Sequence, residues 1–330
     1  MTDNTKKYIK NTLKLFVSLG ALAFVFSKID VGRTWSVMRQ AHLGWLLLAL
    51  LAYVVSQVVS SERVRGMIRA ARVDISRGVN LRLYWLGMFY NFFLPGGIGG
   101  DGYKVYWLRK RFNAEIRPTV VALLGDRLSG LVAISSYTVA YFALRPGLAH
   151  LLGLSPDVSP AVALILIPAA LFFFWLFFYI FQANLCRASL FAVLRSFVVQ
   201  GLQMLAASVI LIALGLCARD AIGDYLFLFL LSSIASAVPV TLGGIGAREV
   251  AFVIGSRVLG TDQDIAVSLS LLFYAVSLIS SLPGVILALR TDLIDGSSVV
   301  PEPDSPPTFS EAIDQVELTD EDGNLISDNE

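Results

Sequence analysis

Long apolar stretches recur along the chain and alternate with short polar segments. A helix needs about 20 residues to cross the roughly 30 Å of hydrocarbon in a bilayer. Stretches of about this length are found near residues 11–27, 43–60, 118–144, 160–182, 196–217 and 265–289. Because such runs are typical of transmembrane helices, the pattern predicts an all-α polytopic membrane protein with about six full transmembrane helices.

Two further apolar pieces are shorter and run directly into glycine-rich sequence. They lie near residues 83–95 and 225–240. A short apolar helix that ends at glycines and a proline is typical of a broken or re-entrant membrane helix. The chain is therefore expected to hold up to eight hydrophobic segments, and the pattern leaves open whether these two re-enter or cross fully.

The composition supports the membrane assignment and argues against soluble enzyme chemistry. Of the 330 residues, 56% are apolar and only 15% are charged, and the mean hydropathy is +0.70. These values lie outside the range of soluble globular domains. Two cysteines and two histidines are too few for a disulfide framework or a His/Cys metal cluster. We expect no bound cofactor and no nucleic-acid partner.

Charge divides the chain into two parts. Residues 291–330 hold 12 of the 25 acidic residues and no lysine or arginine, so residues 1–290 hold all 26 basic residues against the remaining 13 acidic ones. The acidic part is rich in proline and small polar residues and has too little apolar area to fold. We therefore expect a membrane domain over residues 1–290 and a disordered, cytoplasmic acidic tail over residues 291–330.

Basic residues in the short polar segments predict orientation, because cytoplasmic loops carry an excess of lysine and arginine. Three clusters follow this rule: Lys6, Lys7 and Lys10; Arg63, Arg65, Arg69, Arg72, Arg77 and Arg82; and Arg109, Lys110, Arg111 and Arg117. For the last two clusters to share the cytoplasmic side, segment 83–108 must dip into the membrane and return, or cross as two short pieces. The rule places both the N-terminus and the acidic tail in the cytoplasm.

The glycine-rich sequence occurs twice. Gly-Gly-Ile-Gly is found at residues 96–99 and again at residues 243–246, each time after an apolar segment and a proline and before charged residues. The predicted topology makes the two copies enter from opposite faces, which indicates an inverted repeat of residues 8–144 and 158–290. In such transporters, broken helices meet near the midplane, where their N-terminal ends can hold an anionic group. The alternative is that the glycines only permit close helix packing and kinks.

Charges within or beside the apolar segments are the second signal, because a charge is costly inside a membrane. They occur as acid–base pairs: Asp126-Arg127, Arg248-Glu249, Asp101 with Lys104, and Glu62-Arg63. An arginine near a half-helix end would clamp a phosphate, and the acid would hold the arginine or carry a proton. The alternative is that the pairs lock helices together or reach the interface, and we favour this alternative for Glu62-Arg63.

These motifs, taken together and in order, resemble the lysylphosphatidylglycerol synthase transmembrane-region family, whose members are also called flippase-like domain proteins. The likeness covers about residues 8–290 and rests on the arginine-rich loop with Arg63, on the run from Asn91 through Gly97 and Gly99 to Asp101 and Lys104, on Asp126-Arg127, and on the run from Pro239 through Gly244 and Gly246 to Arg248-Glu249. Asp126 stands where glutamate is more usual in the family, which keeps the charge. The resemblance implies a bacterial or archaeal multi-pass protein of the cytoplasmic membrane that moves a lipid between leaflets. The acidic tail is not expected to supply the aminoacyl-transfer domain of the full synthases.

The leading hypothesis is a transporter for an anionic phospholipid or a polyprenyl-phosphate lipid. The expected substrate-binding residues are Arg127, Arg248, Asp126, Glu249, Asp101, Lys104, Gly97, Gly99, Gly244, Gly246, Asn91 and Arg63. A second hypothesis is a lipid-linked transferase with Asp126 or Glu249 as general base, although an enzyme is the less expected class. A third is a non-catalytic membrane partner of a glycosyltransferase or a lipid-modifying enzyme.

Overall fold

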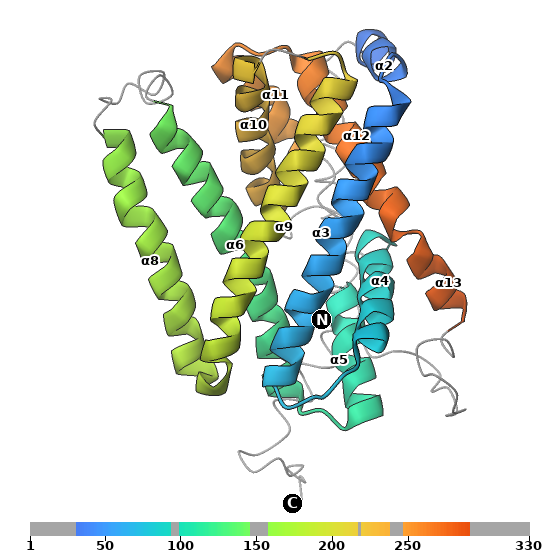
Figure 1. The fold of residues 1–330 in the computed structure, drawn as a ribbon, viewed down its shortest axis with the longest axis vertical. Coiled ribbons are helices and arrows are strands. Elements are labelled where there is room, and N and C mark those ends of the chain that lie inside the picture. The colour runs from blue at the N-terminus through green and yellow to red at the C-terminus, as the bar shows by residue number, and fades with distance from the viewer. Residues whose placement is uncertain (1–30, 94–98, 146–157, 217–218, 238–246, 291–330) are drawn as a thin grey trace, which may run out of the picture.

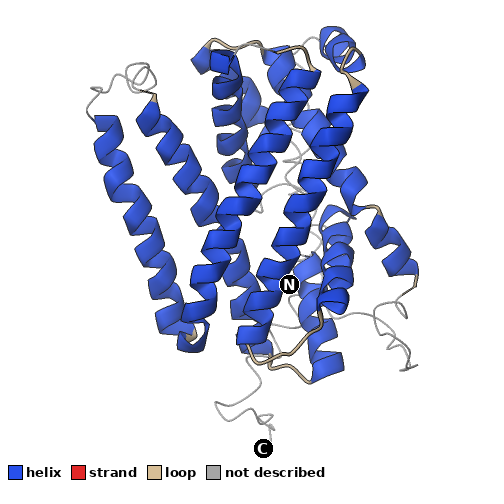
Figure 2. Cartoon of the chain, viewed as in Figure 1, coloured by secondary structure: helices blue, strands red, loops and turns tan. Residues whose placement is uncertain are grey.

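The computed structural model describes residues 31–93, 99–145, 158–216, 219–237 and 247–290, and these residues form helices with no strand among them (Figure 2). The all-α prediction is confirmed. The predicted first span at 11–27, the acidic tail, and three of the predicted glycines lie outside the described residues; the glycines are Gly97, Gly244 and Gly246.

Five helical segments in the described part are long and apolar enough to cross a membrane. They correspond to α3 (Leu43–Ala70), α6 (Ile116–Leu144), α8 (Val158–Phe181), α9 (Cys186–Ala213), and α12 (Gln263–Ser281) with α13 (Pro283–Leu289). At 1.5 Å per residue, the 28 residues of α3 extend about 42 Å. Five of the six predicted spans are therefore present, and the remaining one, at 11–27, lies outside the described residues.

Three predicted boundaries differ from the structure. The predicted span at 43–60 is part of α3, which continues ten residues further to Ala70, so Arg63, Arg65 and Arg69 are helical rather than part of a loop. The predicted span at 196–217 is part of α9, which begins ten residues earlier, at Cys186. The helix therefore includes Arg187 and Arg195, which were predicted to lie outside the span. Arg195 lies beside α3 and donates a hydrogen bond from Nη1 to the carbonyl of Glu62 at 3.1 Å. The predicted span at 265–289 is divided into α12 and α13 at Pro283, whose ring nitrogen carries no hydrogen to donate to a helical bond.

The two shorter apolar pieces each form one arm of a helical hairpin. The first hairpin consists of α4 (Arg77–Phe93) and α5 (Gly99–Phe112), and the second of α10 (Arg219–Ala237) and α11 (Ala247–Leu259). In Figure 1, α4 rises from the lower end of the molecule and α5 returns to that end, whereas α10 and α11 occupy the upper end. The two hairpins therefore lie at opposite ends of the described helices.

Close packing within the first hairpin depends on glycine. A Cβ atom on Gly100 of α5 would clash with the backbone carbonyl of Gly87 of α4. The two helices can approach this closely only because neither residue has a side chain. The contact fixes the inner half of α5, which carries Asp101 and Lys104, against α4.

Basic residues gather at the lower end of Figure 1, where α3 ends, α4 and α6 begin, and α8 is followed by the short 3-10 helix η1 (Ala183–Leu185) and α9. The opposite end carries α2 (Val31–Arg39), which is tied to the start of α12. There Arg33 forms ion pairs with Asp262 at 2.8 Å and Asp264 at 3.1 Å.

Candidate functional site

A cavity of about 470 Å³ lies among α3, α4, α6, α9, α10, α11 and α12. Residues at the inner ends of both hairpins line it: Phe92 near the end of α4, Ser236 near the end of α10, and Arg248 in the first turn of α11. The cavity is thus bordered by residues from the inner ends of both hairpins. Its volume is within the range of small-molecule binding pockets.

Arg248 is the most unusual residue in the cavity wall. Its guanidinium carbon lies 4.6 Å from the ring centroid of Phe273 and 5.0 Å from that of Phe229. Its Nε and Nη2 atoms are buried and have no hydrogen-bond partner among the described residues. Two aromatic faces partly compensate a buried cation, but donors without acceptors remain costly. An anionic ligand in the cavity would satisfy them.

Glu249 follows Arg248 and also lines the cavity. It is 4% exposed and accepts a hydrogen bond from Ser270 of α12 at 3.0 Å. A carboxylate in the first turn of a helix is stabilised by the positive N-terminal end of the helix. The two charged residues that follow the second glycine motif, one cation and one anion, therefore both line the cavity.

Arg127 of α6 is the second arginine in the wall, and the first hairpin holds it in place. Its Nε atom donates to Asp101 of α5, and the other oxygen of Asp101 pairs with Lys104 at 3.0 Å. Lys104 also lies 5.1 Å from the ring centroid of Tyr84. Asp101 and Lys104 are not among the residues that line the cavity; they position Arg127 from behind.

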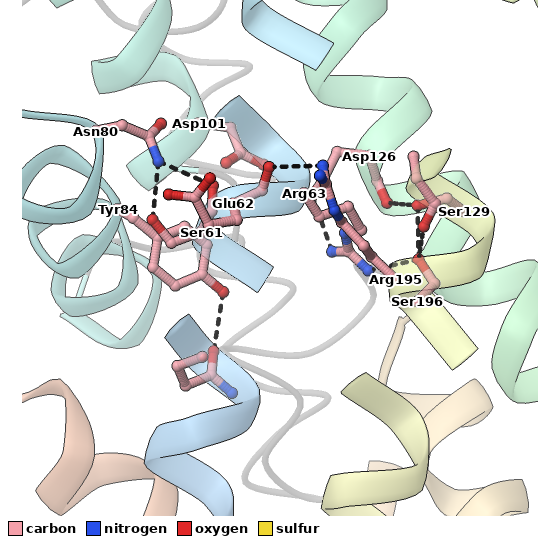
Figure 3. Close-up of polar contacts among 12 residues, drawn as sticks. Ser61, Glu62, Arg63, Asn80, Tyr84, Asp101, Asp126, Ser129, Arg195 and Ser196 are labelled. Atoms are coloured by element: carbon pink, nitrogen blue, oxygen red, sulfur yellow. Dashed lines mark hydrogen bonds and ion pairs between the residues drawn. The ribbon is translucent and has the colours of Figure 1, made fainter. Parts of the chain in front are cut away.

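Asp126 lies next to Arg127 but serves a different partner. Arg63 of α3 reaches both its carboxylate oxygens, from Nε at 2.6 Å and from Nη2 at 3.0 Å, and its third nitrogen donates to Ser196 of α9 at 2.8 Å. Ser129 and Ser196 complete the group with a 2.9 Å contact between their hydroxyls. Figure 3 shows this buried network, which joins three membrane-spanning helices.

The sequence prediction paired neighbouring residues, and the structure pairs residues from different helices instead. Asp126 binds Arg63 rather than Arg127, and Glu62 binds Arg65 at 3.5 Å and Arg77 at 3.8 Å rather than Arg63. Successive side chains on an α-helix point about 100° apart, so neighbours in sequence rarely face each other. Of the predicted pairs, only Asp101 with Lys104, three residues apart, lies on one helix face.

The remaining predicted residues have other positions. Asn91 accepts a hydrogen bond from the backbone N–H of Gly100 at 2.9 Å, which ties the end of α4 to the start of α5. Asn91 is not part of the cavity wall, and its observed contact is structural. Gly99 is the first residue of α5. Of the predicted residues in the described part, the wall of the cavity includes Arg127, Arg248 and Glu249.

Several polar residues of the wall were missed by sequence reasoning. Gln200 and Gln203 of α9 both face the cavity, and the Oε1 atom of Gln200 is buried with no hydrogen-bond partner in the described part of the chain. Two glutamines three residues apart in an apolar helix share one face, and that spacing was the available signal. The other missed polar residues are Tyr53, Ser233, Ser236, Tyr274 and Ser277.

Among the described residues, no group of three or more His, Cys, Asp or Glu side chains is arranged to hold a metal ion. The polar groups that line the cavity are two arginines, the carboxylate of Glu249, amides and hydroxyls. Arginines bind phosphate oxygens, and amides and hydroxyls can hydrogen-bond to hydroxyl groups elsewhere in a phosphate-containing head group.

Comparison with known proteins gives two matches. The family described as the lysylphosphatidylglycerol synthase TM region matches residues 11–284. A UPF0104 membrane protein of Pyrococcus horikoshii is 21% identical over 136 residues. That match covers 41% of this chain and 41% of the relative, so less than half of either protein is compared.

Proposed function

We propose that this chain, which belongs to the lysylphosphatidylglycerol synthase transmembrane-region family, moves a lipid with an anionic phosphate head group between the leaflets of the cytoplasmic membrane. An anionic phospholipid and a polyprenyl-phosphate lipid are the two substrate classes in view. The multi-pass helical fold and the family support a lipid-related membrane role. The transport step is the part that we propose.

The observation that carries the proposal is Arg248. A cation buried between Phe229 and Phe273, with two donor atoms lacking acceptors among the described residues, is unfavourable for the protein alone. A phosphate oxygen in the cavity would accept from those donors, and the planar guanidinium presents them in the geometry that phosphate prefers. The arrangement is explained if the cavity receives a phosphate.

Arg127 supplies the second contact in the proposed site. It lines the same cavity from α6 and is oriented by Asp101, which in turn is held by Lys104. The two arginines come from different halves of the chain, one next to each hairpin. A head group bound between them would link the halves, so a relative movement of the hairpins would expose it first to one side and then to the other.

The carboxylates have different roles in this proposal. Asp126 is fully engaged by Arg63 and therefore fastens α3 to α6 rather than touching the head group. Glu249 lies in the cavity wall beside Arg248, and its carboxylate offsets part of the positive charge of the two arginines. The basic end of the molecule is the proposed cytoplasmic side.

The test is a translocation assay in vesicles that contain the purified protein and a trace of lipid labelled on its acyl chain. A membrane-impermeant quencher reports how fast the label reaches the outer leaflet. We expect Arg248→Ala to slow translocation by about tenfold or more, because a hydrogen bond to a charged group contributes about 1.5–3 kcal/mol. Arg257→Ala is the matched control, because Arg257 is on the same helix but exposed near its far end.

Two results would contradict transport. Equal rates for wild type, Arg248→Ala and Arg257→Ala would remove Arg248 from the site. No movement of phospholipid or polyprenyl-phosphate lipid by folded wild type would contradict the proposal itself. Mass analysis of the same lipids tests the transferase alternative, which requires a chemically altered product.

A further inference from the structure

The charges around the cavity do not cancel. The wall carries two arginines, Arg127 and Arg248, and one carboxylate, Glu249, which is an excess of one positive charge. The next layer adds Asp101 and Lys104, one charge of each sign. Within the described residues, the net charge around the cavity is therefore +1 whether the wall alone or the wall and the next layer are counted.

Two further groups of residues leave this excess of positive charge unchanged. The Arg63–Asp126 pair beyond the second layer is neutral as a unit. The sequence between α4 and α5, residues 94–98, and that between α10 and α11, residues 238–246, contains no charged residue. The count is thus independent of how those segments are placed.

This excess matters because part of the site is buried: Glu249 is 4% exposed and Asp101 8%, whereas the Arg127 side chain is 42% exposed. In a membrane interior, an uncompensated charge is much more costly than in water. A head group with one negative charge would neutralise the site. A head group with two would replace an excess positive charge by an excess negative one.

Lipid phosphates fall into these two classes. A phosphodiester carries one negative charge, whereas a phosphomonoester has a second pKa of about 6 and is mostly dianionic above neutral pH. Resting on the proposed function, we infer that the site takes a phosphodiester lipid, with a single negative charge and a further group beyond the phosphate, in preference to a phosphomonoester. Of the two substrate classes in view, a polyprenyl monophosphate is therefore disfavoured.

Gln200 supports the same assignment independently of charge. Its buried Oε1 atom needs a hydrogen-bond donor, and none is present among the described residues. Gln203, Ser233 and Ser236 line the same cavity and add further uncharged polar groups. A diester whose second arm carries a hydroxyl would donate to Gln200, whereas the ionised phosphate of a monoester has only acceptors.

Three lipids with the same glycerol backbone and the same labelled acyl chain distinguish the effect of head-group charge from the effect of a head-group hydroxyl. Phosphatidylglycerol has one negative charge and head-group hydroxyls, phosphatidylmethanol has one negative charge and no head-group hydroxyl, and phosphatidic acid is mostly dianionic at pH 8. In the vesicle assay at pH 8, we expect phosphatidic acid to move at least about tenfold more slowly than phosphatidylmethanol. We expect Gln200→Leu to slow phosphatidylglycerol to about the rate of phosphatidylmethanol.

A variant that removes the negative charge of the cavity wall should shift the preference towards the dianionic lipid. Glu249→Gln removes the carboxylate of the wall and leaves two positive charges, so the rate for phosphatidic acid should rise relative to phosphatidylmethanol. Glu115→Gln is the matched control, because Glu115 is exposed just before α6 and its side chain makes no cap hydrogen bond. That control should leave the ratio unchanged.

The outcomes separate this inference from the proposed function. If phosphatidic acid moves as fast as the two diesters while transport still depends on Arg248, the transport proposal stands and the charge inference is overturned. If no lipid moves, the transport proposal fails, and competition binding to the detergent-solubilised protein tests the charge inference by itself. Preferential binding of phosphatidylmethanol over phosphatidic acid would support it, and equal binding would overturn it.

Discussion

Arg63 of α3 and Asp126 of α6 form a two-point ion pair, with nitrogen–oxygen distances of 2.6 and 3.0 Å, although each has an oppositely charged neighbour beside it in the sequence. Their side chains are 9% and 11% exposed. A pair this deeply buried depends on both partners being present, because the attraction must offset the desolvation of each charge.

Removing one partner should therefore destabilise the protein more than removing both. We expect Asp126→Leu to lower the free energy of unfolding by about 3–5 kcal/mol, because it leaves the Arg63 charge buried and unpaired. The double variant Arg63→Met with Asp126→Leu should recover a large part of that loss. Thermal unfolding in detergent measures both, and a double variant that shows the sum of the two single losses would contradict a coupled pair.

Arg248 should behave in the opposite way. Because two of its donor atoms lack acceptors among the described residues, Arg248→Met should leave the melting temperature unchanged or raise it. Arg63→Met, a chemically identical change at a hydrogen-bonded arginine, is the comparison and should lower the melting temperature. Equal losses for the two variants would show that Arg248 is part of the structural framework rather than a ligand group.

The glycine contact between α4 and α5 gives a steric prediction. Gly100→Ala should destabilise the protein by about 1–3 kcal/mol, because the new Cβ atom would clash with the carbonyl of Gly87 and force the two helices apart. Transport should fall as well, because Asp101 and Arg127 would lose their alignment. Gly78→Ala is the control, because Gly78 is on α4, as Gly87 is, and its new Cβ would have open space around it; this variant should be neutral or slightly stabilising.

Removal of the acidic tail distinguishes the transporter from the membrane-partner hypothesis. Every residue assigned to the cavity precedes residue 290, so a chain that ends at Arg290 should insert and move lipid at the rate of the full chain. Lipid movement in vesicles and co-purification from membranes are the two measurements. Normal lipid movement in vesicles, with activity lost only in cells, would support a partner that binds the tail.

The fold could be predicted from the sequence to the extent that it depends on local composition. Apolar runs located the long helices, and the repeated glycine motif indicated two broken elements that enter from opposite faces. The start of α9 was missed because Arg187 and Arg195 were treated as loop residues, whereas their long side chains allow a helix to continue past its apolar part.

The site was predictable only in part, because the sequence identifies charges but not their partners. Arg127, Arg248 and Glu249 were found because charges within apolar sequence are rare. Their contacts depend on how each helix is rotated about its axis, and the sequence of one helix does not specify that rotation relative to its neighbours. Gln200 and Gln203 were missed for a related reason, since uncharged polar residues are tolerated within membrane helices and seldom stand out.

The short arms of the two hairpins bear on how high the barrier to transport is. With 14 and 13 residues, α5 and α11 are about 21 and 20 Å long, which is less than the thickness of the hydrocarbon layer. The electrostatic barrier that opposes an ion in a bilayer depends on the thickness of the low-dielectric layer that separates it from water. In the proposed transport, a head group at the inner ends of α5 and α11 would have only part of that layer on either side, so these two short arms would divide one high electrostatic barrier into two lower ones.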